Sequence, residues 1–218
     1  MPRTITVKGI GKAFAKPDYV VLSMHLVSQN MDYEETMHSA SLRIQHLTET
    51  LVSLGFDKAD LKTTNFNIET DYNSEKDCNG NYHRVFNGYK VIQDLKLAFD
   101  FDTNRLATAL SAISGCISNP ELSIRFTVKD ATAINEEMLR SATVNAKRKA
   151  EILCEASGVE LGQLMAIDYN WGELDIYSHT RYDMADECMA APMMERSIEI
   201  EPDDIETTDT ATFVWEIK

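Results

Sequence analysis

One stretch constrains the fold more than any other, Gly88 to Phe101, with the sequence GYKVIQDLKLAFDF. Apolar side chains occupy one parity of this run, interrupted only by Gln93: they are Tyr89, Val91, Leu95, Leu97, Phe99 and Phe101. Alternation with a period of two is typical of a β-strand with one face on a core and the other largely in water. At about 3.3 Å per residue such a strand spans roughly 43 Å, so we expect the fold to be organised around it.

The other predicted strands are shorter and are separated by turn residues. They cover Ile5 to Val7, Tyr19 to Ser28, Leu61 to Thr70, Leu122 to Val128, Leu164 to Tyr169, Ser197 to Glu201 and Thr208 to Ile217. Gly9 and Gly11 follow the first strand, where glycine predicts a bulge or bend. Asn79-Gly80 predicts a hairpin that places residues 66–72 antiparallel to the organising strand.

Three segments have apolar residues at helical spacing. Asp32 begins the first helix and Gly55 ends it, and Asp102 begins the second. The third begins at Asp130 or Thr132 and ends at Gly158. The predicted buried stripes are Met37, Ala40, Ile44, Leu47, Leu51 and Leu54; then Leu106, Leu110, Ile113 and Ile117; then Ile134, Met138, Ala142, Ala146, Ala150 and Leu153.

The order of these elements predicts an α+β fold, with a mainly antiparallel sheet of long strands and helices packed on one face. We expect a single domain over residues 1–218. Residues 171–197 have no apolar periodicity, so they predict a flexible loop. This loop is rich in methionine, which could bind a soft metal such as Cu(I), but its acidic residues favour a mobile or partner-covering segment.

Charge and cysteine content exclude several classes of function. A net charge of −14 disfavours binding to nucleic acids and to anionic membranes. The four cysteines form no C-x-x-C pair, so we expect reduced thiols and no metal or other cofactor; Cys116 and Cys154 are expected in the core, and Cys78 and Cys188 in loops. No apolar run is long enough to span a membrane, and the first residues lack the apolar region of a signal peptide. We therefore expect a cytosolic protein.

The order of several short motifs resembles the SIMPL family, a group of bacterial and animal proteins of ill-defined function. The matching pieces are the opening I-x-V-x-G-x-G with P-D (Ile5, Val7, Gly9, Gly11, Pro17 and Asp18), the strand Leu61 to Ile68, Gly88-Tyr89, Lys149-Ala150, Leu161-Gly162, and Ile200-Glu201-Pro202 before a final alternating strand. The chain departs from the family at Asp203, where the family has glycine.

The resemblance implies an α+β fold and large ring-like oligomers, as in some periplasmic members. It also implies links to stress tolerance in bacteria and to kinase-adaptor binding in animals. It implies no catalytic residues. Many bacterial relatives carry a signal peptide and are periplasmic, whereas this sequence begins without one.

The residues themselves favour a self-assembling or protein-interaction module over an enzyme. There is no G-x-S-x-G, H-E-x-x-H or phosphate-binding glycine loop. His25, His83, Cys78 and Cys188 have no second group at a suitable spacing, so we assign no catalytic, cofactor-binding or metal-binding residue. The organising strand and the closing strand, Thr208 to Ile217, are expected to offer sheet edges for a second copy. The alternative is a small-molecule carrier, or an enzyme assembled only in three dimensions, with a pocket between helices and sheet.

Overall fold

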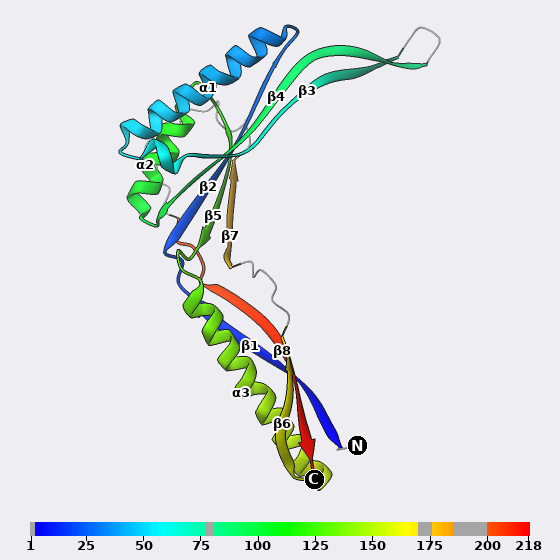
Figure 1. The fold of residues 1–218 in the computed structure, drawn as a ribbon. Helices are drawn as coiled ribbons and strands as arrows, with labels where there is room; N and C mark the ends of the chain where they lie inside the picture. Colours follow the sequence, from blue (N-terminus) through cyan, green and yellow to red (C-terminus); the bar gives the residue numbers. More distant parts are fainter. Residues whose placement is uncertain (1–2, 77–80, 170–175, 185–199) are drawn as a thin grey trace. The chain divides into compact units, whose positions relative to one another are not determined.

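The computed structural model describes residues 3–76, 81–169, 176–184 and 200–218 of the chain. Its internal contacts divide the chain into two compact units, which are described one at a time (Figure 1). One unit comprises residues 1–18, 127–179 and 202–218, and the other comprises residues 19–126 and 180–201. This division does not test whether residues 1–218 form a single domain, which stays a prediction.

The larger unit contains most of a five-stranded sheet with the order β3-β4-β2-β5-β7. Its strands are β2 (Tyr19–Asn30), β3 (Lys62–Lys76), β4 (Tyr82–Asp100), β5 (Glu121–Thr127) and β7 (Tyr177–Met184). Helices α1 (Tyr33–Ser53) and α2 (Thr103–Ser114) lie together on one side of this sheet, and a short 3-10 helix (Lys58–Asp60) follows α1 (Figure 1). With the second sheet described below, this arrangement confirms the predicted α+β class.

Strand β4 is the predicted organising strand, extended at its start to 19 residues. Its odd-numbered residues from Val91 to Phe99 are all buried, Gln93 among them, and their even-numbered neighbours are half-buried. It pairs antiparallel with β2, where Leu22 faces Leu97, and with β3, where Phe66 faces Gln93. The predicted antiparallel pairing is therefore confirmed, while the turn residues Asn79 and Gly80 lie outside the described residues.

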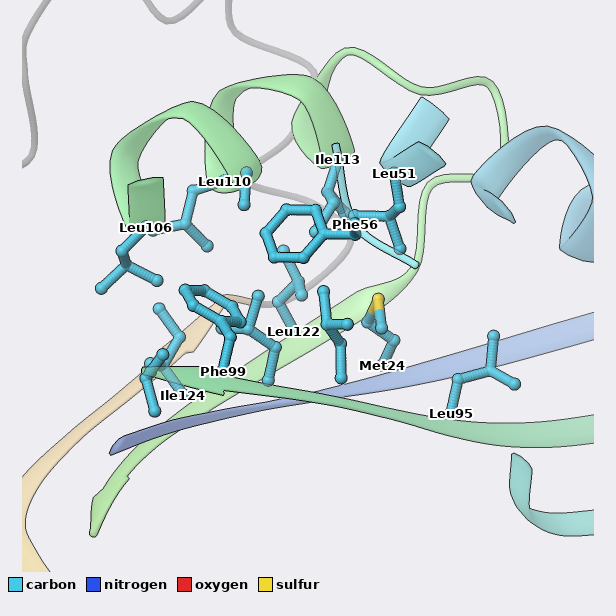
Figure 2. Packing of buried hydrophobic residues seen from close by; sticks show 14 of the residues in the cluster. Met24, Leu51, Phe56, Leu95, Phe99, Leu106, Leu110, Ile113, Leu122 and Ile124 are labelled. Atoms are coloured by element: carbon cyan, nitrogen blue, oxygen red, sulfur yellow. The ribbon is translucent and has the colours of Figure 1, made fainter. Parts of the chain in front are cut away.

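The core of this unit fills the space between the two helices and the sheet. Figure 2 shows α2 directing Leu106, Leu110 and Ile113 towards Phe99 and Phe56. The predicted starts of α1 and α2 are confirmed. The Asp32 carboxylate accepts a hydrogen bond from the Glu35 amide at 3.0 Å. The Asp102 carboxylate likewise accepts a hydrogen bond from the Arg105 amide at 2.7 Å. These caps satisfy amides that would otherwise lack a partner in the first turn.

The end of α2 differs from the prediction. The helix stops at Ser114, so helical spacing no longer applies three residues later, and Ile117 is 86% exposed rather than buried. The segment after it contains Asn119 in a left-handed conformation, with φ of 40°, a region in which asparagine is enriched among non-glycine residues.

The smaller unit pairs one helix with a three-stranded sheet of order β1-β8-β6. The strands are β1 (Thr4–Ala15), β6 (Leu161–Asp168) and β8 (Ile205–Ile217), and the helix is α3 (Thr132–Ser157). The predicted stripe of α3 is buried from Ile134 to Ala150, as expected. The residue predicted to end the buried stripe, Leu153, is wrong, because it is half-exposed. Cys154, four residues after Ala150, is buried instead. Gly158 ends the helix with φ of 69°, as predicted.

Gly9 and Gly11 do not form the predicted bulge. The register between β1 and β8 is unbroken from Thr4 to Ala15. A Cβ atom at either glycine would instead fall within 3.0 Å of a backbone carbonyl oxygen of α3, that of Ala142 for Gly9 and that of Met138 for Gly11. The glycines, together with the alanines of α3, therefore let the helix backbone lie directly against the strand.

The expected loop at 171–197 contains a strand. Residues 177–184 form β7 at one edge of the five-stranded sheet, beginning next to the buried Ile176. An edge strand with hydroxyl, aromatic and charged side chains has no apolar alternation, so its pattern was not recognised. The predicted strand at Ser197 to Glu201 is wrong where it can be judged, because Ile200 and Glu201 are not in a strand. Residues 185–199, with Met189, Met193 and Met194, lie outside the described residues.

The expected sheet edges are also corrected. Both β4 and β8 lie inside their sheets, with a neighbour on each side. The edges are β3 and β7 in the larger sheet and β1 and β6 in the smaller one. Because edge position depends on which strands pair, periodicity within one strand cannot reveal it.

Candidate functional site

Strand β6 exposes an unusual amount of apolar side chain for a strand of eight residues. Leu164, Met165 and Ile167 are 47%, 53% and 56% exposed. Among the described strands it pairs with β8 alone, and that pairing is interrupted by two register shifts, one between Leu161 and Leu164 and one between Leu164 and Ala166. We call Leu164, Met165 and Ile167 the β6 apolar surface.

The position of α3 explains this exposure. Leu164 and Ile167 lie opposite Trp215 and Phe213 on β8, and cross-strand partners lie on the same face of a sheet. Those two aromatic side chains stack at 5.5 Å between ring centroids and are buried with Ala146 of α3. Since α3 packs chiefly on β1 and β8, it covers Phe213 and Trp215, whereas the apolar side chains beside them on β6 stay exposed.

The five-stranded sheet carries a second feature, a polar groove of about 560 Å³. Its lining comes from all five strands: Ser23, Met24 and His25 of β2, Thr64 of β3, Asp94 and Leu95 of β4, Glu121, Leu122 and Ser123 of β5, and Arg181 and Asp183 of β7. His25 and Asp94 are direct cross-strand partners, and His25 Nδ1 lies 2.6 Å from Asp94 Oδ1. Asn65 Nδ2 donates to Asp94 Oδ2 at 2.9 Å.

Hydrogen bonds hold both aspartates of the groove in the charged form. Partial burial raises the pKa of Asp94, but hydrogen bonds from His25 and Asn65 and the charge of His25 outweigh it, so the pKa lies below its ordinary value of 3.8. The Ser123 hydroxyl and Arg181 likewise lower the pKa of Asp183, and Arg181 Nε lies 3.0 Å from Asp183 Oδ1. The groove therefore keeps two carboxylates ionised at neutral pH.

The structure does not bring His25 and His83 together, and it describes two of the four cysteines, Cys116 and Cys154. His25 on β2 has Asp94 as its hydrogen-bond partner. His83 lies far along β4, opposite Glu75 of β3, and Cys78 and Cys188 lie outside the described residues. Cys154 is buried as predicted, and Cys116 is only partly buried. Within the described ranges, no three histidine, cysteine or acidic residues are placed to hold a metal ion.

Sequence reasoning missed Asp94 and the β6 apolar surface. The alternation of β4 already assigned Asp94 to the outer face, and that of β2 did the same for His25. The missing information was the register between the two strands. For β6 the sequence predicts a strand but not its exposed face, because nothing in the strand itself indicates how far the helix reaches.

The depressed pKa of Asp94 predicts acid sensitivity. A group whose pKa is lower in the folded chain contributes stability above its unfolded pKa of 3.8, and this contribution is lost as the pH falls through the folded pKa. As the pH is lowered from about 5 to about 2, the urea concentration at the midpoint of unfolding should therefore fall less for Asp94→Asn than for the wild-type chain. Urea unfolding at each pH measures this. Parallel curves for the two proteins would show that the carboxylate is not stabilised by its neighbours.

Comparison with known proteins gives two findings. The sequence model of the SIMPL family, described as a protein of unknown function, matches residues 5–215. The 26 kDa periplasmic immunogenic protein of Brucella melitensis is 25% identical over 169 residues, and that of Brucella abortus is 24% identical over the same length. Each alignment covers 76% of this chain and 66% of the relative. No helix in the described part of the chain is long and apolar enough to cross a membrane.

Proposed function

Because the chain belongs to the SIMPL family, we propose that it works as a self-assembling interaction module that docks through the β6 apolar surface. The observation that carries the proposal is the exposure of three large apolar side chains within four residues of one edge strand. Contiguous exposed apolar side chains mark association sites because water contact with them is unfavourable. Ile10 and Phe14 of β1 are also exposed, but they lie at the opposite edge and on the other face of the sheet, so they do not extend this surface.

The form of β6 indicates how a second copy would bind. The two register shifts of β6 are β-bulges or irregularities, and they disturb the row of backbone N–H and C=O groups with which another strand would have to pair. Natural edge strands use bulges in this way to resist the addition of a further strand. We therefore infer contact through side chains rather than a continued sheet. An obligate contact of this kind buries about 2,000 Å² or more and has an apolar centre.

A charge placed on this surface should dissociate the assembly. The wild-type chain is expected to be a defined oligomer at micromolar concentration, and Ile167→Lys should shift it to monomer, because burying an unpaired ammonium is costly. Light scattering coupled to size exclusion measures the mass. Circular dichroism should be unchanged, since Ile167 is more than half exposed.

Ile117→Lys is the matched control, because this isoleucine is exposed in the larger unit, far along the chain from β6. It should leave the mass unchanged. A wild-type chain that is monomeric over the whole micromolar range, or an Ile167→Lys variant that keeps the wild-type mass, would contradict the proposal.

The carrier alternative has less support. A pocket between helices and sheet would need empty space there, and the side chains of the core fill the part of that region between α2 and the sheet (Figure 2). Two hollows of about 770 Å³ lie along α1. One runs along residues 34–46 to Ile117 and Ser118, apart from the sheet-facing stripe of this helix. The other lies along residues 41–53 with Lys58, and it reaches the sheet at Gln93 of β4.

Compartment, partners and physiological role are further proposals. The relatives are named as periplasmic proteins, whereas the sequence predicts a cytosolic one, and we keep the cytosolic compartment as a proposal to be tested by fractionation. A role in stress tolerance and a protein partner besides a second copy rest on the family resemblance alone. Loss of the gene without a change in stress survival would argue against the first of these.

A further inference from the structure

The polar groove contains a histidine held in one orientation by two successive partners on neighbouring strands. Asn65 on β3 donates to Asp94 on β4, and Asp94 faces His25 on β2 across the sheet. Each of the two Asp94 carboxylate oxygens thus has one of these partners, Oδ1 towards His25 and Oδ2 towards Asn65. Because the antiparallel register places all three side chains, the imidazole has little freedom to turn.

The orientation determines which imidazole nitrogen can act on a ligand. A carboxylate only accepts hydrogen bonds, so Nδ1 carries the proton shared with Asp94. In the neutral ring Nε2 then has a lone pair, and among the described residues no hydrogen bond to Nε2 is formed. A histidine oriented by a carboxylate, with its second nitrogen free in a groove, has the arrangement that general bases use.

We propose that this groove is a hydrolytic site in which His25 is the general base and Asp94 and Asn65 are positioning residues. The reaction consumes water and an ester. His25 Nε2 takes a proton from water as the water oxygen bonds to the carbonyl carbon. The bond from that carbon to the alcohol oxygen then breaks, and the proton on Nε2 passes to the leaving oxygen. The products are a carboxylic acid and an alcohol, and His25 returns to its neutral form.

Charge and size define the class of ester. Asp94, Asp183 and Glu121 contribute three negative charges to the groove, and Arg181 is the only lysine or arginine among its described lining residues. Anionic substrates are therefore repelled, while neutral and cationic esters are admitted. A volume of about 560 Å³ is sufficient for a small acyl group and its alcohol. Arg181 is paired with Asp183 through its Nε, and we assign its two terminal guanidinium nitrogens to the oxyanion that develops on the carbonyl oxygen.

The test measures initial rates of hydrolysis of p-nitrophenyl acetate by the full chain. A general base contributes about 10²–10⁴-fold, so His25→Gln should lower the rate by at least about 100-fold, towards the rate without protein. His46→Gln removes another imidazole from the chain and should leave the rate unchanged, which excludes non-specific catalysis by histidine. The anionic p-nitrophenyl hemisuccinate should be hydrolysed more slowly than the neutral acetate.

Asp94→Asn distinguishes a positioning role from a structural one. It should lower kcat while KM changes little, because Asp94 orients the base and does not hold the substrate. Nitrogen NMR of the imidazole should show the proton on Nδ1 in the wild-type chain and a mixture of the two tautomers in Asp94→Asn. Equal rates for the wild-type chain and His25→Gln, with both folded by circular dichroism, would overturn the proposal.

Discussion

Leu97→Asp should unfold the larger unit. Leu97 is completely buried near the end of β4, opposite Leu22, among the apolar side chains of the core cluster. A buried unpaired charge, together with the lost apolar packing, belongs to the small group of substitutions that cost more than about 4 kcal/mol. Denaturant unfolding followed by circular dichroism should show a chain that has lost most of its helix and strand signal in buffer alone.

Lys96→Asp is the matched control on the other face of the same strand. Lys96 is only half-buried and lies between Ser23 and Lys62, so the same aspartate remains in contact with water there. We expect a change in the free energy of unfolding of no more than about 1 kcal/mol. If both variants unfolded at the same denaturant concentration, the assignment of the two faces would be wrong.

Gly11→Ala should strongly destabilise the smaller unit, although it adds a single methyl group. The new Cβ would meet the carbonyl oxygen of Met138, and a backbone atom in a long helix cannot turn aside as a side chain can. Overpacking a filled core costs about 1–3 kcal/mol, occasionally more, and we expect the upper end of this range. Thermal unfolding, with tryptophan fluorescence to follow Trp215 of this unit, measures the effect.

Gly115→Ala is the control for this change. Gly115 follows α2 with a helical φ of −83°, and a Cβ there would make ordinary contacts at 3.5 Å or more. Alanine at such a position restricts the unfolded chain and should be neutral or stabilising by up to about 1 kcal/mol. Equal losses of stability in the two variants would show that the close approach of α3 to β1 is not the cause.

Local chemistry made several features of this protein predictable. The alternation around Leu97 predicts both the strand and its buried face, because side chains in a strand alternate whatever the strand pairs with. The caps at Asp32 and Asp102 are predictable for a similar reason, since the partner amide lies three residues away in the chain. The order of helices and strands from β1 to β6 followed from these local patterns.

Features that depend on what approaches from elsewhere in the chain were not predictable from the pattern alone. The roles of Gly9 and Gly11 become visible only with α3 in place, since glycine in a strand fits a bulge as well as a close backbone contact. Strand β7 gains its structure from its neighbour and has no apolar alternation of its own.

The same distinction between local pattern and tertiary contact applies to the polar groove and to the β6 apolar surface. The sequence by itself determined that His25 and Asp94 are on the outer faces of their strands and that β6 contains large apolar residues. Only the tertiary structure decided that His25 faces Asp94 and that α3 leaves Ile167 uncovered. The physical reason is that side-chain parity is a property of one strand, whereas register and coverage are set by the packing energy of whole elements against one another.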